Sequence, residues 1–346
     1  MEFSHTGTEE TFRDNSVKPE RPWLAPLAGF SDLPFRLLCR EYGCTTACTE
    51  MVSVKGLVYG GQNTYELIRS VDWDRPLVVQ LFGEDPSFFR EAAHRLLQQG
   101  ISYFDLNAGC SVKKVFKGGA GAALLADPQR MFRILEEMVR VAGEGRVGVK
   151  LRSGIQTDEF VSGPSVVELD HLGLGWVALH PRSAKQGFSG EASWSHLKRL
   201  KERIGVPLLA SGDLFTAEDA LSCLNRTGVD GLMFARGALD RPFIFHEFLQ
   251  SLQTGQAGPE EKRKEQSRRL AAARRHVQLS REYGDPDRSF LKMRTILPRY
   301  LRGFPLVRKF RSRIVRASDW EEIESLLAEL ESCVSVCEAD IEQGRN

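Results

Sequence analysis

The stretch Ile101-Ser-Tyr-Phe-Asp-Leu-Asn-Ala-Gly-Cys110 passes from an apolar run into polar residues and a thiol. An apolar run as short as Ile101 to Phe104 is typical of a strand buried in a parallel sheet. Lysines and glycines follow as far as Gly121, so the Cys110 thiol stands beside flexible, cationic backbone. The sequence therefore predicts that Cys110 is a nucleophile or a proton donor, with a small buried apolar side chain as the alternative.

Segments of this kind recur along the first two thirds of the chain. They are Trp23–Ala28, Thr45–Thr49, Leu77–Leu81, Tyr103–Asn107, Val147–Leu151, Trp176–His180, Pro207–Ser211 and Gly231–Ala235. Helical patterns lie between most of them, at Pro86–Gln99, Pro128–Val141, Val166–Leu172, Trp194–Ile204 and Ala217–Leu224. Eight strands that alternate with helices predict an α/β fold, the TIM (β/α)8 barrel. An open doubly wound sheet is the alternative, but no Gly-x-Gly-x-x-Gly fingerprint follows the first strand.

The chain divides into three predicted parts. Residues 1–20 are polar and lack the apolar core of a signal peptide, which predicts a disordered leader. Residues 21–250 hold the strands and form the barrel domain. Residues 251–346 open on a break that contains Gly and Pro and then carry a helical pattern, which predicts an all-helical bundle.

Composition narrows the class of protein. No apolar run approaches the roughly 20 residues that a membrane-spanning helix needs, so we expect no membrane partner. The seven cysteines lack the spacing and histidine partners of a zinc site, which predicts no metal and a reducing cytoplasm. We expect a monomer.

Charge is distributed unevenly along the chain. Residues 262–316 contain 18 Lys and Arg against four Asp and Glu, a net charge of +14, while the whole chain has a net charge of +1. The remaining residues therefore sum to about −13. A basic appendage on an acidic body predicts a polyanionic partner, and nucleic acid is favoured over a merely solvated helical face.

The reactive groups of a TIM barrel lie at the carboxyl ends of its strands, and phosphate sites favour the loops after strands seven and eight. The candidates at these ends are Pro26, Leu27 and Ala28; Gln80; Asn107 and Cys110; Lys150 and Arg152; His180 and Arg182; Ser211, Gly212 and Asp213; and Ala235 and Arg236. The last two groups, with Gly237, are the predicted phosphate loops, because glycine lets the backbone approach an anion and Arg236 adds donors.

Two candidates have more than one interpretation. Lys150, with Gln80, could bind the edge of a planar heterocycle, could form a Schiff base as in an aldolase, or could be a strand-end lysine that reaches water. His180 could be a general base, a phosphate donor or a satisfied core histidine.

These residues fall within an ordered series of longer motifs. The series runs through Ala25-Pro-Leu-Ala-Gly-Phe-Ser-Asp-Leu-Pro-Phe-Arg36, Thr49-Glu-Met51, Val79-Gln-Leu-Phe-Gly83, Asp105-Leu-Asn-Ala-Gly-Cys110, Lys150-Leu-Arg-Ser-Gly154, Leu179-His-Pro-Arg182, Ser211-Gly-Asp213 and Met233-Phe-Ala-Arg236. With this series the chain resembles the tRNA-dihydrouridine synthases over about residues 22–317. That family combines an FMN-binding TIM barrel with a C-terminal helical tRNA-binding domain.

The resemblance implies a role for each matched residue. Reduced FMN would give hydride to C6 of a uridine in tRNA, and the Cys110 thiol would protonate C5, which yields 5,6-dihydrouridine; NADPH would then reduce the flavin again. Asn107 resembles the residue that hydrogen-bonds the uracil. The implied FMN contacts are Pro26, Leu27, Ala28, Gln80, Lys150, His180, Ser211, Gly212, Asp213, Ala235 and Arg236. The further RNA-binding candidates are Arg152, Arg182, Lys292, Arg294, Arg299 and Arg302.

The chain departs from the family pattern at four positions. Ser111, Leu27, Ser211 and Ala235 stand where the family usually has Pro, Met, Asn and Gly. None of these departures removes a reactive group. The alternatives are an FMN oxidoreductase that acts on another RNA, such as rRNA, or on a small metabolite, a Schiff-base aldolase, and an RNA-binding protein with an inactive barrel.

Overall fold

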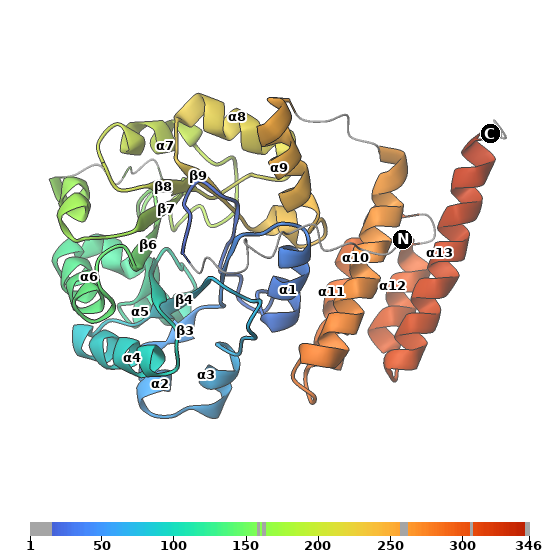
Figure 1. Cartoon of the computed structure of the whole chain (residues 1–346), viewed down its shortest axis with the longest axis horizontal. Helices are drawn as coiled ribbons and strands as arrows, with labels where there is room; N and C mark the ends of the chain where they lie inside the picture. The colour runs from blue at the N-terminus through green and yellow to red at the C-terminus, as the bar shows by residue number, and fades with distance from the viewer. Residues whose placement is uncertain (1–15, 158–159, 161–163, 257–261, 305–306, 343–346) are drawn as a thin grey trace.

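The computed structural model describes residues 16–157, 160, 164–256, 262–304 and 307–342. These residues form a rounded body of strands and helices with an elongated stack of helices beside it (Figure 1). A barrel followed by a helical region is the predicted order.

The body is a closed barrel of eight parallel strands. They are β1 (Trp23–Leu24), β2 (Thr46–Cys48), β4 (Leu77–Phe82), β5 (Tyr103–Ala108), β6 (Val147–Arg152), β7 (Trp176–His180), β8 (Leu208–Ala210) and β9 (Gly231–Phe234). Strand β1 pairs with both β2 and β9, which closes the sheet, and β2 pairs with β4 beside the two-residue strand β3 (Val52–Ser53). The TIM barrel is therefore confirmed, and closure excludes the open doubly wound sheet.

Helices surround the barrel. They are α1 (Leu33–Glu41), α2 (Val54–Val58), α3 (Gln62–Glu66), α4 (Pro86–Gln98), α5 (Lys113–Lys117), α6 (Pro128–Ala142), α7 (Trp194–Lys201), α8 (Ala217–Thr227) and α9 (Ile244–Thr254), with 3-10 turns at η2 (Gly121–Ala126), η3 (Pro164–His171) and η4 (Arg236–Ala238). Four of them, α4, α6, α7 and α8, begin where the sequence predicts. The predicted helix Val166–Leu172 falls mostly within the 3-10 helix η3 instead. Asp85, Asp127 and Thr216 cap their helices by accepting backbone N–H groups at 2.9–3.1 Å.

The alternation of side chains along each strand decides which residues enter the barrel. Apolar residues pack together in the barrel interior, among them Trp23, Cys48, Val78, Trp176, Ala178, Leu209 and Met233. Two positions further along the strands lie Gln80, His180, Ser211 and Ala235. These four predicted site residues therefore share the inward face and stand at the carboxyl ends of the strands.

The described part of the predicted leader, residues 16–20, lies against the barrel. The backbone carbonyl of Lys18 accepts a hydrogen bond from Trp23 Nε1 at 3.0 Å. The Pro19 carbonyl fits against Gly231, where a Cβ atom would lie only 1.8 Å from that oxygen. These five residues are thus part of the packed body, and the rest of the predicted leader lies outside the described residues.

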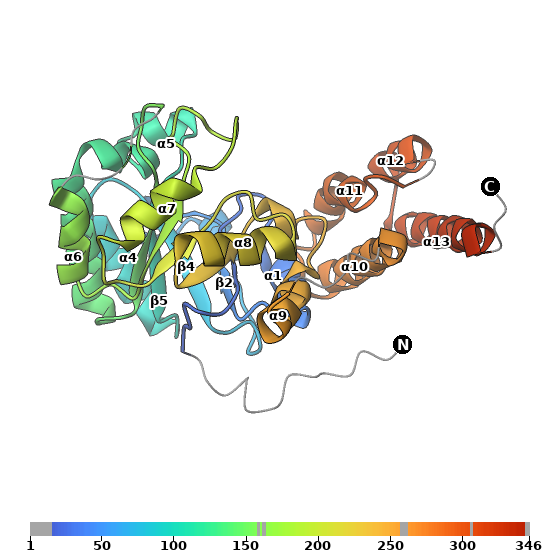
Figure 2. The same cartoon turned by 90° about the horizontal axis from the view of Figure 1, so that it is seen from above.

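The C-terminal region consists of α10 (Lys262–Tyr283), α11 (Ser289–Tyr300), α12 (Val307–Arg316) and α13 (Trp320–Glu342). Helix α10 packs on α1 of the barrel (Figure 2). Arg275 of α10 pairs with Glu41 of α1 at 2.6 Å. Helix α9 runs through the predicted boundary at residue 250 and ends at Thr254. None of the helices described is long and apolar enough to cross a membrane.

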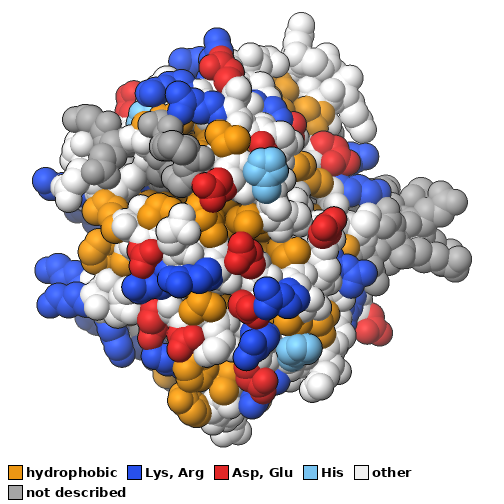
Figure 3. Space-filling view, turned by 90° about the vertical axis from the view of Figure 1, so that its left-hand side faces the viewer, with side chains coloured by type: hydrophobic (Ala, Val, Ile, Leu, Met, Phe, Trp, Pro, Cys, Tyr) orange, Lys and Arg blue, Asp and Glu red, His pale blue; other side chains and the backbone are white. Residues whose placement is uncertain are grey.

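The barrel surface away from the bundle carries both signs of charge. Figure 3 shows Lys and Arg interspersed with Asp and Glu across this face. The bundle stretch with a net charge of +14 lies on the opposite side of the molecule (Figure 1).

Candidate active site

The two predicted phosphate loops meet at Asp213. This residue adopts a φ of 53° and accepts two hydrogen bonds from Arg182, at 2.8 and 2.7 Å. It also accepts from Arg236 at 3.1 Å and from the backbone N–H of Ala192 at 2.8 Å. One carboxylate thereby fixes two guanidinium groups at the carboxyl ends of β7 and β9.

Gly212 allows a close approach in the first of these loops. Its φ is 141°, and a Cβ atom there would lie 2.8 Å from Cδ2 of His180. Trp194 donates from Nε1 to the Gly212 carbonyl at 3.3 Å. A side chain at position 212 would therefore displace His180, which explains the need for glycine.

Four cations converge on His180, namely Lys150, Arg152, Arg182 and Arg236. Burial, and after it the positive charges of these side chains, lower the pKa of His180 to about 2, so its imidazole is neutral. Burial also lowers the pKa of Lys150 to about 8 and that of Arg152 to about 10. Charging these groups together is costly, so the site favours a bound anion.

A chain of amide hydrogen bonds crosses the barrel below these cations. Trp176 Nε1 donates to Asp105 Oδ1 at 2.9 Å, and Gln80 Nε2 donates to Asp105 Oδ2 at 2.7 Å. Asn107 Nδ2 donates to Gln80 Oε1 at 2.7 Å. Because a carboxylate only accepts, these contacts fix the orientation of both amides. Burial is the main cause that raises the pKa of Asp105 to about 6.

Asn107 also hydrogen-bonds the loop that carries the Cys110 thiol. Its Oδ1 accepts the backbone N–H groups of Gly109 at 3.2 Å and Cys110 at 2.9 Å. Both acceptor sites of this oxygen are used, and one Nδ2–H remains for a further partner. The Cys110 side chain is partly exposed, and its carbonyl accepts from Ala122 at 2.9 Å. Asn107 therefore positions the backbone of Cys110 and retains one N–H donor.

Two barrel arginines predicted to bind RNA, Arg152 and Arg182, donate most of their hydrogen bonds to groups of the protein itself. Arg152 donates to the carbonyls of Gly109, Ser183 and Gly187 at 2.8–2.9 Å. Arg182 donates to Ser189 and Gly190 in addition to Asp213. Both side chains are buried. These contacts hold the loop after β7 in place. In this loop the Phe188 ring stacks against Arg152 and Arg236, whose guanidinium carbons lie 5.6 and 4.6 Å from the ring centroid.

The loop after β1 contributes backbone to the rim of the site. Ser31 Oγ accepts from the N–H of Leu27 at 3.0 Å and donates to its carbonyl at 3.3 Å. Glu50 accepts the N–H of Gly29 at 2.5 Å. The predicted segment from Pro26 to Ala28 is thus anchored at both sides.

Residues 23–336 match the protein-family model described as dihydrouridine synthase (Dus). The chain belongs to the dihydrouridine synthase family. A probable tRNA-dihydrouridine synthase 1 of Synechocystis is 33% identical over 90% of this chain and 87% of its own length. The tRNA-dihydrouridine synthase B of Pseudomonas aeruginosa is 36% identical over 70% of this chain and 72% of its own.

Two more distant similarities complete the comparison. The tRNA-dihydrouridine(47) synthase [NAD(P)(+)] of Cryptococcus neoformans is 34% identical over 65% of this chain and 33% of its own length. A morphinone reductase structure matches 70% of this chain and 88% of its own with a TM-score of 0.48 and 13% identity, too distant to bear on the chemistry.

The RNA-binding candidates of the helical region occupy different environments in this dihydrouridine synthase. Lys292 Nζ lies 2.7 Å from Asp32 and 3.5 Å from Glu50, both on the barrel. Arg294 donates to the Val315 carbonyl at 2.6 Å. Arg299 stacks on Phe30 of the barrel at 4.6 Å, and Arg302 is 62% exposed. The first two carry structural contacts, whereas the last two face the junction with the barrel.

Asp105, Trp176 and Phe188 take part in the site but were not among the predicted residues. Asp105 opens a motif already quoted for the family, and its inward position follows from the alternation along β5. Trp176 is the first residue of strand β7, and its neighbours in the sequence are those of an ordinary core residue, so no local pattern marks it as part of a site. Within the described part of the chain, no group of three or more His, Cys, Asp or Glu could hold a metal ion.

Proposed function

We propose that this protein is an FMN- and NADPH-dependent synthase that reduces a uridine of transfer RNA to 5,6-dihydrouridine. Membership of the dihydrouridine synthase family and the names of the similar proteins support the reaction and the RNA class. The observation that carries the proposal is the convergence of four cations on a neutral His180, at the same rim of the barrel as an ordered, partly exposed Cys110.

The donors present suit FMN, which carries a phosphate and a planar ring with amide-like edges. Arg236, the neutral His180 and the backbone of Gly212 would hold the phosphate. Gln80 and Lys150 stand deeper in the barrel mouth and would meet the ring. When bound and reduced, the flavin supplies the hydride that C6 of the uracil receives.

Protonation of C5 is assigned to the Cys110 thiol. A general acid must be held in position, and Asn107 does this by accepting the backbone N–H of Cys110. The loop that carries the thiol is therefore ordered before substrate binds. The remaining Nδ2–H of Asn107 would hydrogen-bond a uracil carbonyl and thereby orient the base toward the thiol.

The helical region would supply the binding energy for RNA. A uridine must leave the stacked RNA to reach the barrel, at a cost of a few kcal/mol. The net charge of +14 on residues 262–316 suits phosphate contacts that offset this cost. We propose residues 21–250 as catalytic domain and 251–346 as RNA-binding domain. We also propose a cytoplasmic location, which the free thiols of the described cysteines suit, and a monomer.

An absorption spectrum of the purified protein tests the cofactor first. We expect the bands of oxidised FMN, which bleach when NADPH is added without oxygen. The reduced protein should then form dihydrouridine in tRNA from cells that lack this modification, measured by mass spectrometry of nucleosides. A colourless protein that FMN cannot reconstitute would refute the proposal.

A further inference from the structure

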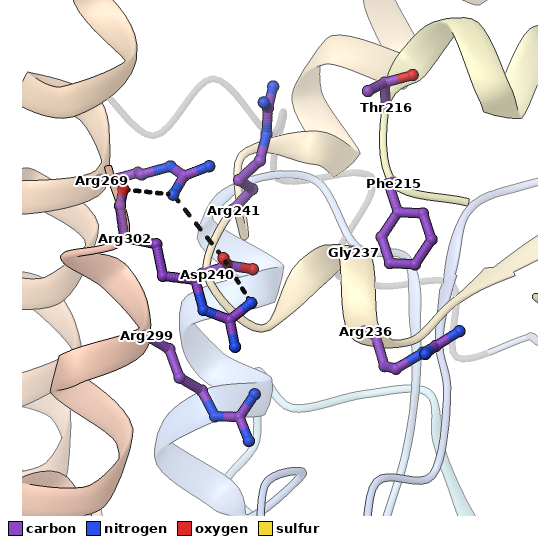
Figure 4. A pocket seen from close by; sticks show the side chains of 9 residues that line it. All are labelled: Phe215, Thr216, Arg236, Gly237, Asp240, Arg241, Arg269, Arg299 and Arg302. Atoms are coloured by element: carbon purple, nitrogen blue, oxygen red, sulfur yellow. Dashed lines mark hydrogen bonds and ion pairs between the residues drawn. The ribbon is translucent and has the colours of Figure 1, made fainter. Parts of the chain in front are cut away.

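A pocket lies at the junction of the barrel and the helical region, and we call it the junction pocket. Its volume is about 430 Å³, and its lining residues are Phe215, Thr216, Arg236, Gly237, Asp240, Arg241, Arg269, Arg299 and Arg302. Figure 4 shows Arg299 and Arg302 entering from the helical side and Arg236 from the barrel side. Asp240 lies between Arg269 and Arg302, at 3.8 and 3.9 Å (Figure 4). Five arginines against one aspartate give this pocket an excess of positive charge.

The arginines differ in how far acids neutralise them. Arg241 pairs with Glu265 at 3.1 Å and Glu247 at 3.3 Å, and Arg269 also pairs with Glu265. Among the residues that the structure describes, the one acid paired with Arg302 is Asp240, at 3.9 Å.

Arg299 presents its donors to the pocket in a different way. Its guanidinium covers the ring of Phe30 with one face, at 4.6 Å from the ring centroid. Stacking of this kind leaves the N–H edge available for an anion. Arg299 and Arg302 therefore provide the least neutralised donors on the helical side.

The junction pocket shares one wall with the predicted phosphate loops. Arg236 lines the pocket and also donates to Asp213 at 3.1 Å, within the site assigned to the cofactor phosphate. Gly237 lets its loop approach the loop after β8 closely, because a Cβ atom would lie 2.1 Å from the Leu214 carbonyl oxygen. An anion in the pocket is thus placed directly outside the barrel mouth.

We infer that the junction pocket binds a backbone phosphate of the RNA next to the extruded uridine, an inference that rests on the proposed function. An extruded nucleotide carries its base into the barrel and leaves its phosphodiesters at the rim, where the pocket opens. Donors from both the barrel and the bundle meet there, so one phosphate contacts both domains at once. Asp240 opposes the phosphate and sets the affinity below its maximum.

Two substitutions with opposite expected effects test this inference. Arg302→Gln removes a donor, and we expect tRNA that lacks dihydrouridine to bind about fivefold more weakly, with a salt slope smaller by about 0.7–0.9. Asp240→Asn removes the opposing charge, and we expect binding to tighten severalfold, a result that misfolding cannot imitate. Arg281→Gln is the matched control, because Arg281 pairs with Glu321 and Glu324 of α13 and lies outside the pocket.

Titrations of the flavin-loaded protein give the outcomes. Weakening by Arg302→Gln and tightening by Asp240→Asn, with the control unchanged, support the inference. Equal tRNA affinities for all three variants and wild type overturn it. A raised KM for NADPH in Arg302→Gln, measured as flavin bleaching without RNA while tRNA affinity is unchanged, also overturns it and assigns the pocket to the reductant. Absence of flavin binding would instead refute the proposed function, so the two failures are distinguishable.

Discussion

The indole nitrogen of Trp176 donates a hydrogen bond to Asp105 Oδ1 at 2.9 Å, although strand β6 lies between the two residues. In the register of the sheet, Gly148 of β6 stands beside both Asp105 and Trp176. A Cβ atom at Gly148 would lie 2.0 Å from the indole ring. The contact therefore depends on Gly148, because its missing side chain leaves room for the Trp176 indole on the inner face of β6. The indole then fixes the position of the Asp105 carboxylate below the site.

Replacement of this donor should destabilise the barrel. In Trp176→Phe, one oxygen of a buried carboxylate loses its partner, and we expect the free energy of unfolding to fall by about 1–3 kcal/mol. Urea titration followed by circular dichroism measures this. Trp320→Phe is the control, because Trp320 packs on Phe290 at a helix surface. An equal loss in both variants would mean that ring volume, rather than the hydrogen bond, is responsible.

Asp105 should make stability depend on pH in a defined window. Its pKa is raised to about 6, above the value of about 3.9 for an unfolded chain. The folded state therefore binds more protons between pH 4 and 6, and this contribution to stability is lost as the pH rises through that window. The loss amounts to about 3 kcal/mol at about 1.4 kcal/mol for each pKa unit.

The variant Asp105→Asn isolates this effect. Its unfolding free energy should lack the decline between pH 4 and 6 that the wild type shows. Denaturant titrations at half-unit pH intervals would give both curves. Parallel curves for the two proteins would exclude Asp105 as the titrating group.

Cys110 should be needed for reduction of uridine and not for flavin binding. In Cys110→Ala we expect the yellow cofactor to remain and dihydrouridine formation to fall by about 10²–10⁴-fold, the range for loss of a positioned acid. Single-turnover assays with prereduced protein measure this step alone. Cys333→Ala, in α13, is the control and should retain full activity. Unchanged turnover in Cys110→Ala would assign the proton to another donor.

Lys150 should make cofactor binding depend on pH. Because its pKa is lowered to about 8, its positive charge is present below that pH and is lost as the pH rises through it. We expect FMN affinity of the apoprotein to decline above about pH 8. Lys150→Met should weaken binding by about 10- to 100-fold at pH 7 and abolish the decline. Fluorescence titration with FMN reads out both effects, and Lys198→Met, on exposed α7 surface, should behave as wild type.

The pair of Lys292 and Asp32 should couple the bundle to the barrel. Both side chains are partly buried, at 23% and 27% exposure, so we expect an interaction energy of about 0.5–1 kcal/mol. A double-mutant cycle with Lys292→Ala and Asp32→Asn measures it by thermal unfolding, and asparagine preserves the cap on α1. Additive effects would show that the contact contributes nothing to stability.

Local signals explain how much of the fold was predicted. Apolar runs with polar ends identified all eight barrel strands, because burial on both faces selects such runs wherever the strand lies. Helix α1 was not identified, since Leu33–Glu41 carries apolar residues around most of its surface where α10 covers it. The predicted site residues from Gln80 to Arg236 lie together because strand ends must gather at one rim.

The sequence by itself determined the number and order of the strands, the thiol at the end of β5 and the basic charge of residues 262–316, since each depends on neighbours in the chain. Only the tertiary structure decided that Trp176 reaches Asp105 past Gly148 and that Lys292 pairs with Asp32. It also decided that Arg236, Arg299 and Arg302 line one pocket. The physical reason is that barrel closure and the docking of α10 on α1 set these distances, and both depend on packing among residues far apart in the chain.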